Sequence, residues 1–188
     1  MPARGAGTAV LVEGVSDQAA VEALAARLGH DLAAEGVAVM PIGGAHAVAR
    51  VARELGPRGE GLRLVGLCDA AEERVYRRGL AQAGVGEPAD RDELERLGFF
   101  VCVEDLEDEL LRAVGKGQVE RLFEAHGDLR AFRTLQGQPA WRGRDAQAQM
   151  RRFLGAGARR KHRYGRLLAE AVDPGRVPRP LAGLLGRL

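Results

Sequence analysis

Residues 10–29 read VLVEGVSDQAAVEALAARLG, and this stretch decides the fold of the N-terminal part of the chain. An apolar run that begins at residue 8 ends on Glu13, a glycine follows, and Asp17 opens a segment with apolar residues at helical spacing. The pattern is typical of a buried β-strand that turns directly into an α-helix. A charged residue at the end of a buried strand is uncommon without a partner. Asp17 either caps its helix or joins Glu13 in binding a metal ion.

The alternation of apolar strands and amphipathic helices continues as far as residue 105. Continuous apolar strands separated by helices predict a parallel sheet that is covered on both faces. After residue 105 only helical patterns follow, so the predicted fold class is α/β, with about four parallel strands flanked by helices and a C-terminal helical extension. We expect strands at 8–13, 37–42, 62–69 and 99–103, and helices at 17–35 (N-cap Ser16 or Asp17, ended by Gly36), 45–55, 70–83 and 90–97.

The composition indicates a folded domain in a reducing compartment. The 188 residues are 46% hydrophobic and 29% charged, which fits one globular domain with a small appendage. No apolar run approaches the roughly 20 residues of a membrane span, and the first residues do not resemble a secretory signal. Cys68 and Cys102 lie in strand-like runs without zinc spacing, so we expect buried free thiols. The predicted location is the cytoplasm, with no membrane contact.

The charges are distributed unevenly. Residues 151–188 carry ten basic against two acidic residues, a net charge of +8, whereas residues 1–150 carry eighteen against twenty-four, a net charge of −6. A basic segment on an acidic body indicates contact with a polyanion, although a solvated basic helix explains it equally well. The arginines expected to follow a nucleic-acid backbone are Arg151, Arg152, Arg159, Arg160 and Arg163.

Acidic residues stand at three of the predicted strand ends. Glu13 and Asp69 end the first and third strands, and residues 104–108, EDLED, follow the fourth. Ligands of an open parallel sheet bind at the carboxyl ends of its strands, so these acids are expected to gather there if the first and third strands are neighbours. Oxygen ligands without histidine or cysteine favour Mg²⁺ or Mn²⁺ over zinc. Each acid also has an ordinary explanation as a helix cap, notably Asp17, Asp69 and Asp105.

Five segments together resemble the Toprim domain of the overcoming lysogenization defect (OLD) family of nucleases. They are LVEGVSDQAAVEAL, MPIGGAHAVARV, LVGLCDAAEE, FFVCVEDLEDELLRAVG and RKHRYGRLLAEAV, in this order within residues 8–173. The resemblance implies a Toprim-like Rossmannoid fold. Its catalytic core would span 1–110, and a helical extension over 111–188, basic from 151, would pack on that core.

The resemblance also implies roles for individual residues. Glu13 would be the central carboxylate, acting on a metal ion or as a general base, and Lys161 would stabilise charge in the transition state. The second Asp of the family's Asp-x-Asp motif is replaced here by Ala71, which puts one of two metal positions in doubt. Glu72 and Glu73 are the candidates to supply the missing oxygen ligand. The implied metal ligands are Glu13, Asp17, Asp69, Glu107 and Asp108.

The implied function is a Mg²⁺- or Mn²⁺-dependent endonuclease, with one or two ions, acting on DNA in preference to RNA. Because of Ala71, the alternative is a catalytically weakened module that binds nucleic acid or an ATPase partner. A third reading is another Toprim phosphoryl-transfer activity, such as that of a small ribonuclease or a primase. The chain shows no G-x-x-x-x-G-K-[ST] motif, so it is either a stand-alone version of the domain, with an ATPase as a possible separate subunit, or a fragment of something longer. A homodimer is left open.

Overall fold

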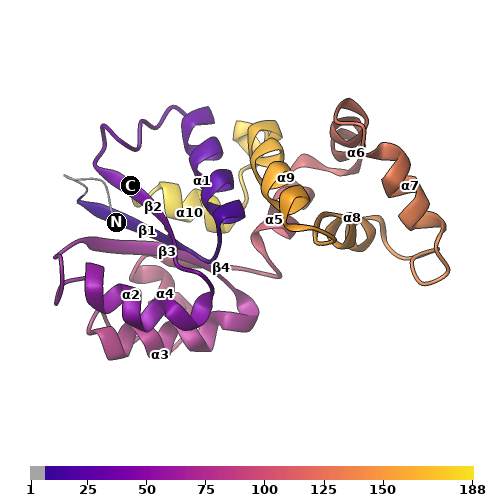
Figure 1. The fold of residues 1–188 in the computed structure, drawn as a ribbon. Coiled ribbons are helices and arrows are strands. Elements are labelled where there is room, and N and C mark those ends of the chain that lie inside the picture. Colours follow the sequence, from indigo (N-terminus) through magenta and orange to yellow (C-terminus); the bar gives the residue numbers. More distant parts are fainter. Residues whose placement is uncertain (1–6) are drawn as a thin grey trace.

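The computed structural model describes residues 7–188, in which four parallel strands form a single sheet (Figure 1). Their spatial order is β2-β1-β3-β4, so β1 and β3 are neighbours as the site prediction required. Every predicted strand is present, and no strand end differs from the prediction by more than one residue. The strands are β1 (Thr8–Val12), β2 (Val37–Pro41), β3 (Arg63–Asp69) and β4 (Phe99–Cys102).

Both faces of the sheet are buried, because successive residues of each strand pack on opposite sides. In β1, Ala9 and Leu11 belong to the core beneath α2 (Val48–Leu55), α3 (Glu73–Ala83) and α4 (Arg91–Arg96). Val10 and Val12 belong to the core beneath α1 (Val15–Arg27), α5 (Leu106–Val114), α9 (Ala158–Ala171) and α10 (Arg179–Leu185). The predicted α/β class with a doubly covered sheet is therefore confirmed. The helices of the first half are α1 (Val15–Arg27), α2 (Val48–Leu55), α3 (Glu73–Ala83) and α4 (Arg91–Arg96), and short 3₁₀ turns precede α2 (Ala45–Ala47) and α3 (Ala70–Glu72).

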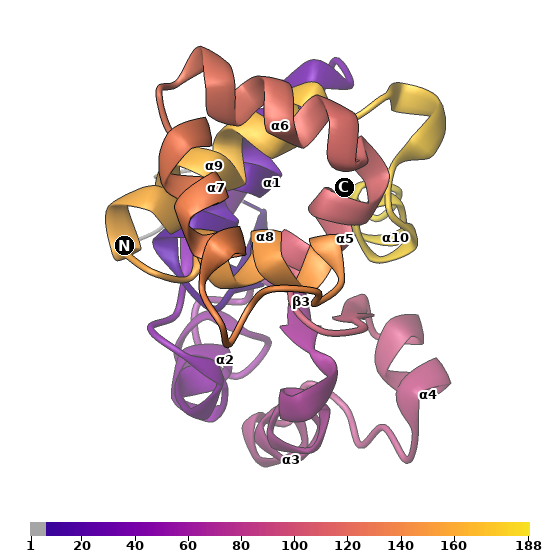
Figure 2. The ribbon, with the colours of Figure 1, turned by 90° about the vertical axis from the view of Figure 1, so that its right-hand side faces the viewer.

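From the end of β4 to residue 188 the regular elements are all helices. The helices are α5 (Leu106–Val114), α6 (Lys116–Ala125), α7 (Leu129–Gly137), α8 (Ala146–Leu154), α9 (Ala158–Ala171) and α10 (Arg179–Leu185). Helices α6, α7 and α8, which we call the cap, project beyond the sheet (Figures 1 and 2). The Phe123 ring packs in the cap at about 5 Å from those of Phe132, Phe153 and Tyr164. Helix α9 returns to pack along α1, and α10 packs on β4.

The first helix differs from the prediction at both ends. It ends at Arg27 and not at residue 35, because Gly29 adopts φ +89° and the backbone amide of His30 donates to the Ala25 carbonyl. Its N-cap is Gly14, and Asp17 is the third residue of the helix. The predicted cap at Ser16 or Asp17 is therefore wrong by position, although Asp17 still closes the first turn by accepting from the Gly14 amide at 2.9 Å.

The two cysteines are free and buried, as predicted. They cannot pair in this fold, since Cys68 packs in the core beneath α2 and α3 and Cys102 packs on the opposite face of the sheet. Within residues 7–188, no helix combines the length and the hydrophobicity that crossing a membrane requires.

Candidate metal centre

A pocket of about 200 Å³ opens at the carboxyl edge of the sheet. Because β1 and β3 are parallel neighbours, Glu13, directly after β1, and Asp69, the last residue of β3, reach this edge together. The start of α1, the start of α5 and the first part of α9 form the remaining walls. The lining residues are Glu13, Gly14, Ser16, Asp17, Gly44, Asp69, Asp105, Leu106, Glu107 and Lys161.

Glu13 lies at the base of the pocket in an electrostatically unfavourable position. Its Oε1 atom is buried and has no hydrogen-bond partner within residues 7–188. Burial raises the pKa of Glu13, and the nearby charges of Asp17 and Glu72 raise it further. A buried carboxylate oxygen without a donor is costly, so this position calls for a proton or a cation.

Asp69 shows the same imbalance more strongly. Burial, followed by the charge of Glu13, raises its pKa from 3.8 to about 8. Asp69 forms no ion pair with any residue in the 7–188 range. Within residues 7–188 the sheet edge thus holds two carboxylates that have no ion-pair partner, and only a backbone amide and the charge of Lys161 lower the pKa of Glu13.

Asp17 combines both of the roles that the sequence left open. One of its oxygens, Oδ2, accepts the Gly14 amide, which is a capping interaction, and Oδ1 lies 3.5 Å from the Ser16 hydroxyl. The side chain nevertheless lines the pocket, and burial raises its pKa. A carboxylate oxygen that accepts one hydrogen bond keeps a second lone pair, so the cap does not prevent Asp17 from binding a metal ion.

The α5 side of the pocket carries acids that already have basic partners. Glu107 is 4% exposed, and its Oε2 lies 3.3 Å from Nζ of Lys161. Burial raises the pKa of Glu107 to about 7, while Lys161 opposes the rise. Asp105 caps α5 by accepting the Asp108 amide at 2.8 Å and also accepts from Nε of Arg151 at 2.7 Å. Asp105 lines the pocket; the sequence placed it among the acids that follow the fourth strand and as a helix cap, but not among the implied metal ligands.

The Gly43-Gly44 turn fixes the backbone of Glu13. The amides of both glycines donate to the Glu13 carbonyl at 3.0 Å. Their φ angles are +80° and +103°, a region that residues with a side chain rarely adopt, so the turn requires glycine. The structure thereby explains why a Gly-Gly pair follows β2, and it adds Gly44 to the wall of the pocket.

The donor set fits a hard divalent cation. All acidic groups in the pocket are carboxylates, no histidine or cysteine lines it, and one buried oxygen of Glu13 lacks a partner. Among residues 7–188, however, no three such side chains lie close enough together to hold an ion. Mg²⁺ is commonly bound by one or two carboxylates and several waters, so the pair Glu13 and Asp69 suits a single ion better than a closed cage.

Several predicted ligands lie outside the pocket lining. Asp108 accepts from Nε2 of Gln147 at 2.7 Å and lies 3.5 Å from Arg112. Glu73 accepts from Arg91 at 2.8 Å, which directs it toward α4. Ala71 and Glu72 belong to the 3₁₀ turn before α3, and Glu72 acts on Glu13 only through its charge.

Most of the predicted phosphate-binding arginines are engaged within the protein. Arg151 pairs with Glu104 and Asp105, at 2.8 and 2.7 Å. Arg163 pairs with Asp128 at 2.9 Å, and Arg160 stacks on the Phe153 ring at 4.1 Å and lies 3.9 Å from Asp128. Of the other two, Arg152 lies 6.0 Å from the Trp141 ring, and Arg159 is exposed.

The fold and the site define a parallel α/β domain with an acidic centre at the carboxyl edge of its sheet, the class that includes Toprim domains. The particular family follows from comparison with known proteins. Residues 6–60 match the family model described as "Overcoming lysogenization defect protein-like, TOPRIM domain". This match confirms the OLD-like Toprim resemblance seen in the motifs.

Solved structures extend this likeness over nearly the whole chain. Two structures of the C-terminal region of the Xanthomonas campestris pv. campestris OLD protein share 25% and 26% identity, each with a TM-score of 0.70, and cover 98% of this chain and 95% and 94% of theirs. The C-terminal region of the Burkholderia pseudomallei OLD protein has a TM-score of 0.70 at 20% identity, covers 96% of both chains, and shows the shared fold. No curated protein sequence gives a significant match.

Proposed function

We propose that this chain is a metal-dependent phosphodiesterase that cuts nucleic acid, DNA in preference to RNA, as an endonuclease. The proposal is supported by membership in the OLD-like Toprim class, whose domain is the nuclease region of OLD proteins. The observation that carries it is the buried, unpartnered Oε1 of Glu13 beside the uncompensated Asp69. Two such carboxylates at a sheet edge form a cation-binding site, and without a cation they would destabilise the fold.

The acidic residues of the pocket would bind the metal ion, and Lys161 would stabilise charge on the phosphate. Glu13 and Asp69 would hold Mg²⁺ or Mn²⁺, with Asp17 and Glu107 as further oxygen ligands for one or two ions. When bound, such an ion activates water at neutral pH and neutralises charge on a phosphate. The Gly43-Gly44 turn keeps Glu13 in place at the base of the pocket, and the Gly14 amide holds Asp17 beside it.

Lys161 would supply positive charge to the reacting phosphate. Its ammonium group lies at the pocket wall beside Glu107, and the acids around it raise its pKa even though burial acts in the opposite direction. It is therefore a cation at neutral pH, and a phosphate that enters the pocket meets it without any need for proton uptake. A fixed charge of this kind stabilises the charge that develops during phosphoryl transfer.

A plasmid-nicking assay tests the proposal. Purified protein is incubated with supercoiled plasmid in Mg²⁺, Mn²⁺ or Ca²⁺ beside the variant Glu13→Gln and the control Glu54→Gln. Glu54 is an exposed residue of α2 that pairs with Arg50, outside the pocket. Nicking by the wild type and by Glu54→Gln but not by Glu13→Gln supports the proposal. Equal nicking by all three proteins contradicts it.

A second candidate function is binding of nucleic acid or of an ATPase partner without cleavage. It is favoured by Ala71, which supplies no carboxylate after Asp69, and by the absence of any three grouped ligands within residues 7–188. Retained, salt-sensitive DNA binding without cleavage in any of the three ions would support this function.

A further inference from the structure

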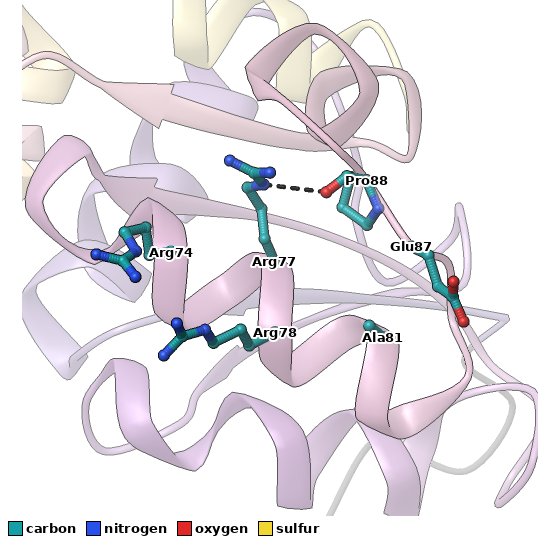
Figure 3. A pocket seen from close by; sticks show the side chains of 6 residues that line it. All are labelled: Arg74, Arg77, Arg78, Ala81, Glu87 and Pro88. Carbon is teal, nitrogen blue, oxygen red and sulfur yellow. Dashed lines mark hydrogen bonds between the residues drawn. The ribbon is translucent and has the colours of Figure 1, made fainter.

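A second pocket, of about 390 Å³, lies on the opposite side of the sheet from α1 and α9, along α3 (Figure 3). Three of its six lining residues are arginines and one is acidic, so the lining carries a net charge of +2. Its apolar lining is confined to a methyl group and a proline ring. The lining residues are Arg74, Arg77, Arg78, Ala81, Glu87 and Pro88.

The three arginines have different surroundings. Arg77 is hydrogen-bonded within the protein: its Nε donates to the Pro88 carbonyl at 3.0 Å, and its guanidinium also donates to the Ala89 carbonyl. Arg74 and Arg78 are exposed, and neither makes a hydrogen bond or an ion pair with any residue from 7 to 188. They stand one helical turn apart, so their side chains leave the same face of α3, as Figure 3 shows.

The position of α3 connects this pocket to the acidic one. Helix α3 follows Asp69 after a single 3₁₀ turn, and Arg74 belongs to its first turn. Arg74 thus lies at the end of the helix that is nearer to the carboxyl edge of the sheet and Arg78 at its middle, while Glu87 lies toward the other end of the pocket (Figure 3). A polyanion that extends from the acidic pocket along α3 would meet these two unpaired charges first.

We infer that Arg74 and Arg78 bind backbone phosphates of the nucleic acid whose reacting phosphate lies in the acidic pocket; this inference rests on the proposed function. The guanidinium fork matches phosphate geometry, and an exposed, unpaired arginine loses no internal partner when it binds. Arg151, Arg160 and Arg163, in contrast, would have to give up Glu104, Asp105 or Asp128. A peptide partner would find almost no apolar anchor in this pocket.

Fluorescence anisotropy with a labelled DNA duplex tests the inference. The full chain is titrated in EDTA over a range of salt concentrations, so that binding is measured without cleavage. We expect the double variant R74Q/R78Q to bind roughly tenfold more weakly, and the slope of log affinity against log salt to fall by about 1.8, or roughly 0.9 for each lost phosphate contact. Thermal unfolding should be unchanged, since both side chains are exposed and unpaired.

Two further variants make the result specific. R74K/R78K keeps both charges and should retain most of the affinity. R176Q/R187Q removes two exposed arginines, also without partners among the described residues, in the C-terminal segment around α10, which covers the other face of the sheet. This control should bind like the wild type.

The inference is overturned if R74Q/R78Q binds like the wild type with the same salt slope, or if R74K/R78K is as weak as R74Q/R78Q. Because binding is measured in EDTA, the outcome is separate from that of the proposed function. If the wild type binds DNA through α3 but cleaves nothing in any of the three ions, the nuclease proposal is contradicted and the binding inference stands.

Discussion

The two sides of the acidic pocket both carry carboxylates, but only one side pairs them with basic residues. On the α5 side, Glu107 pairs with Lys161 and Asp105 pairs with Arg151. On the sheet side, Glu13 and Asp69 have no basic partner within residues 7–188, and one oxygen of Glu13 has no partner at all. On the α5 side each of these acids therefore has a basic partner in the protein, whereas the sheet-side carboxylates have no ion-pair partner among the described residues and are best balanced by a proton or a cation.

The largest expected effect comes from removing the uncompensated charge of Glu13. The variant Glu13→Gln should lose cleavage by a factor of about 10² or more, since an interaction required in the transition state is removed. In EDTA the same variant should unfold at a higher temperature than the wild type, because a buried carboxylate without a partner has been replaced by a neutral group. Plasmid nicking and thermal unfolding measure the two effects.

Opposite changes in activity and stability distinguish a metal ligand from a structural residue. The control Glu54→Gln, at an exposed position of α2, should change neither quantity appreciably. A Glu13→Gln protein that is less stable than the wild type in EDTA would show that the chain already compensates this carboxylate, and the contrast between the two sides of the pocket would disappear.

The next largest effect is expected on the α5 side, where removing Lys161 should lower stability, in contrast to the gain expected for Glu13→Gln. Lys161→Met leaves Glu107 buried without its cation, and we expect a loss of roughly 1–2 kcal/mol in the free energy of unfolding. The loss stays below that for a fully buried pair because the Lys161 side chain is 43% exposed. Cleavage should also fall, by at least about tenfold, because a charge at the phosphate is removed. Denaturant unfolding and the nicking assay provide the measurements.

The double variant Lys161→Met/Glu107→Gln separates the two roles of the lysine. With no buried charge left alone, stability should return toward that of the wild type, while cleavage should stay low. If the double variant recovers cleavage together with stability, Lys161 acts by holding Glu107 in place and not on the phosphate.

The sequence located the acids well because local patterns determine where a strand ends. A continuous apolar run bounded by glycine or charge fixed each strand within one residue, and strand order then placed Glu13 and Asp69 at one edge. The first helix was predicted too long, because Leu28 and Leu32 continue the helical spacing past Gly29, whose positive φ ends the helix. Hydrophobic periodicity predicts which face of a helix is buried, but it does not predict where the helix ends.

The sequence could not show which charges are already paired. Arg163 meets Asp128 and Arg151 meets Asp105, partners that are 35 and 46 residues away in the chain. Such pairs depend on how the cap helices fold back toward α5 and α9, which no local pattern contains. The basic C-terminal segment therefore suggested a nucleic-acid surface, although three of the five arginines named for it are paired within the protein.

A smaller effect should appear when the pH is changed without metal. Burial and the charge of Glu13 raise the pKa of Asp69 from 3.8 to about 8, so the folded protein holds a proton that the unfolded chain releases. This contribution to stability is complete below about pH 4 and is lost as the pH rises through about 8. In EDTA the melting temperature should fall across this range, and Asp69→Asn should flatten the fall. A wild-type profile as flat as that of Asp69→Asn would contradict the assignment.

The smallest effect is expected at Asp108, which neighbours Glu107 in the chain but lies outside the pocket lining. Its side chain accepts from Gln147 and lies 3.5 Å from Arg112, so Asp108→Asn removes a charge whose partner is 40% exposed. We expect a stability loss of no more than about 1 kcal/mol and less than about a threefold change in nicking. A loss of cleavage as large as that of Glu13→Gln would mean that α5 turns when the metal ion binds and brings Asp108 into the site. The α5 side would then share in holding the ion, and the division between a self-compensated and a cation-requiring side would hold only for the metal-free protein.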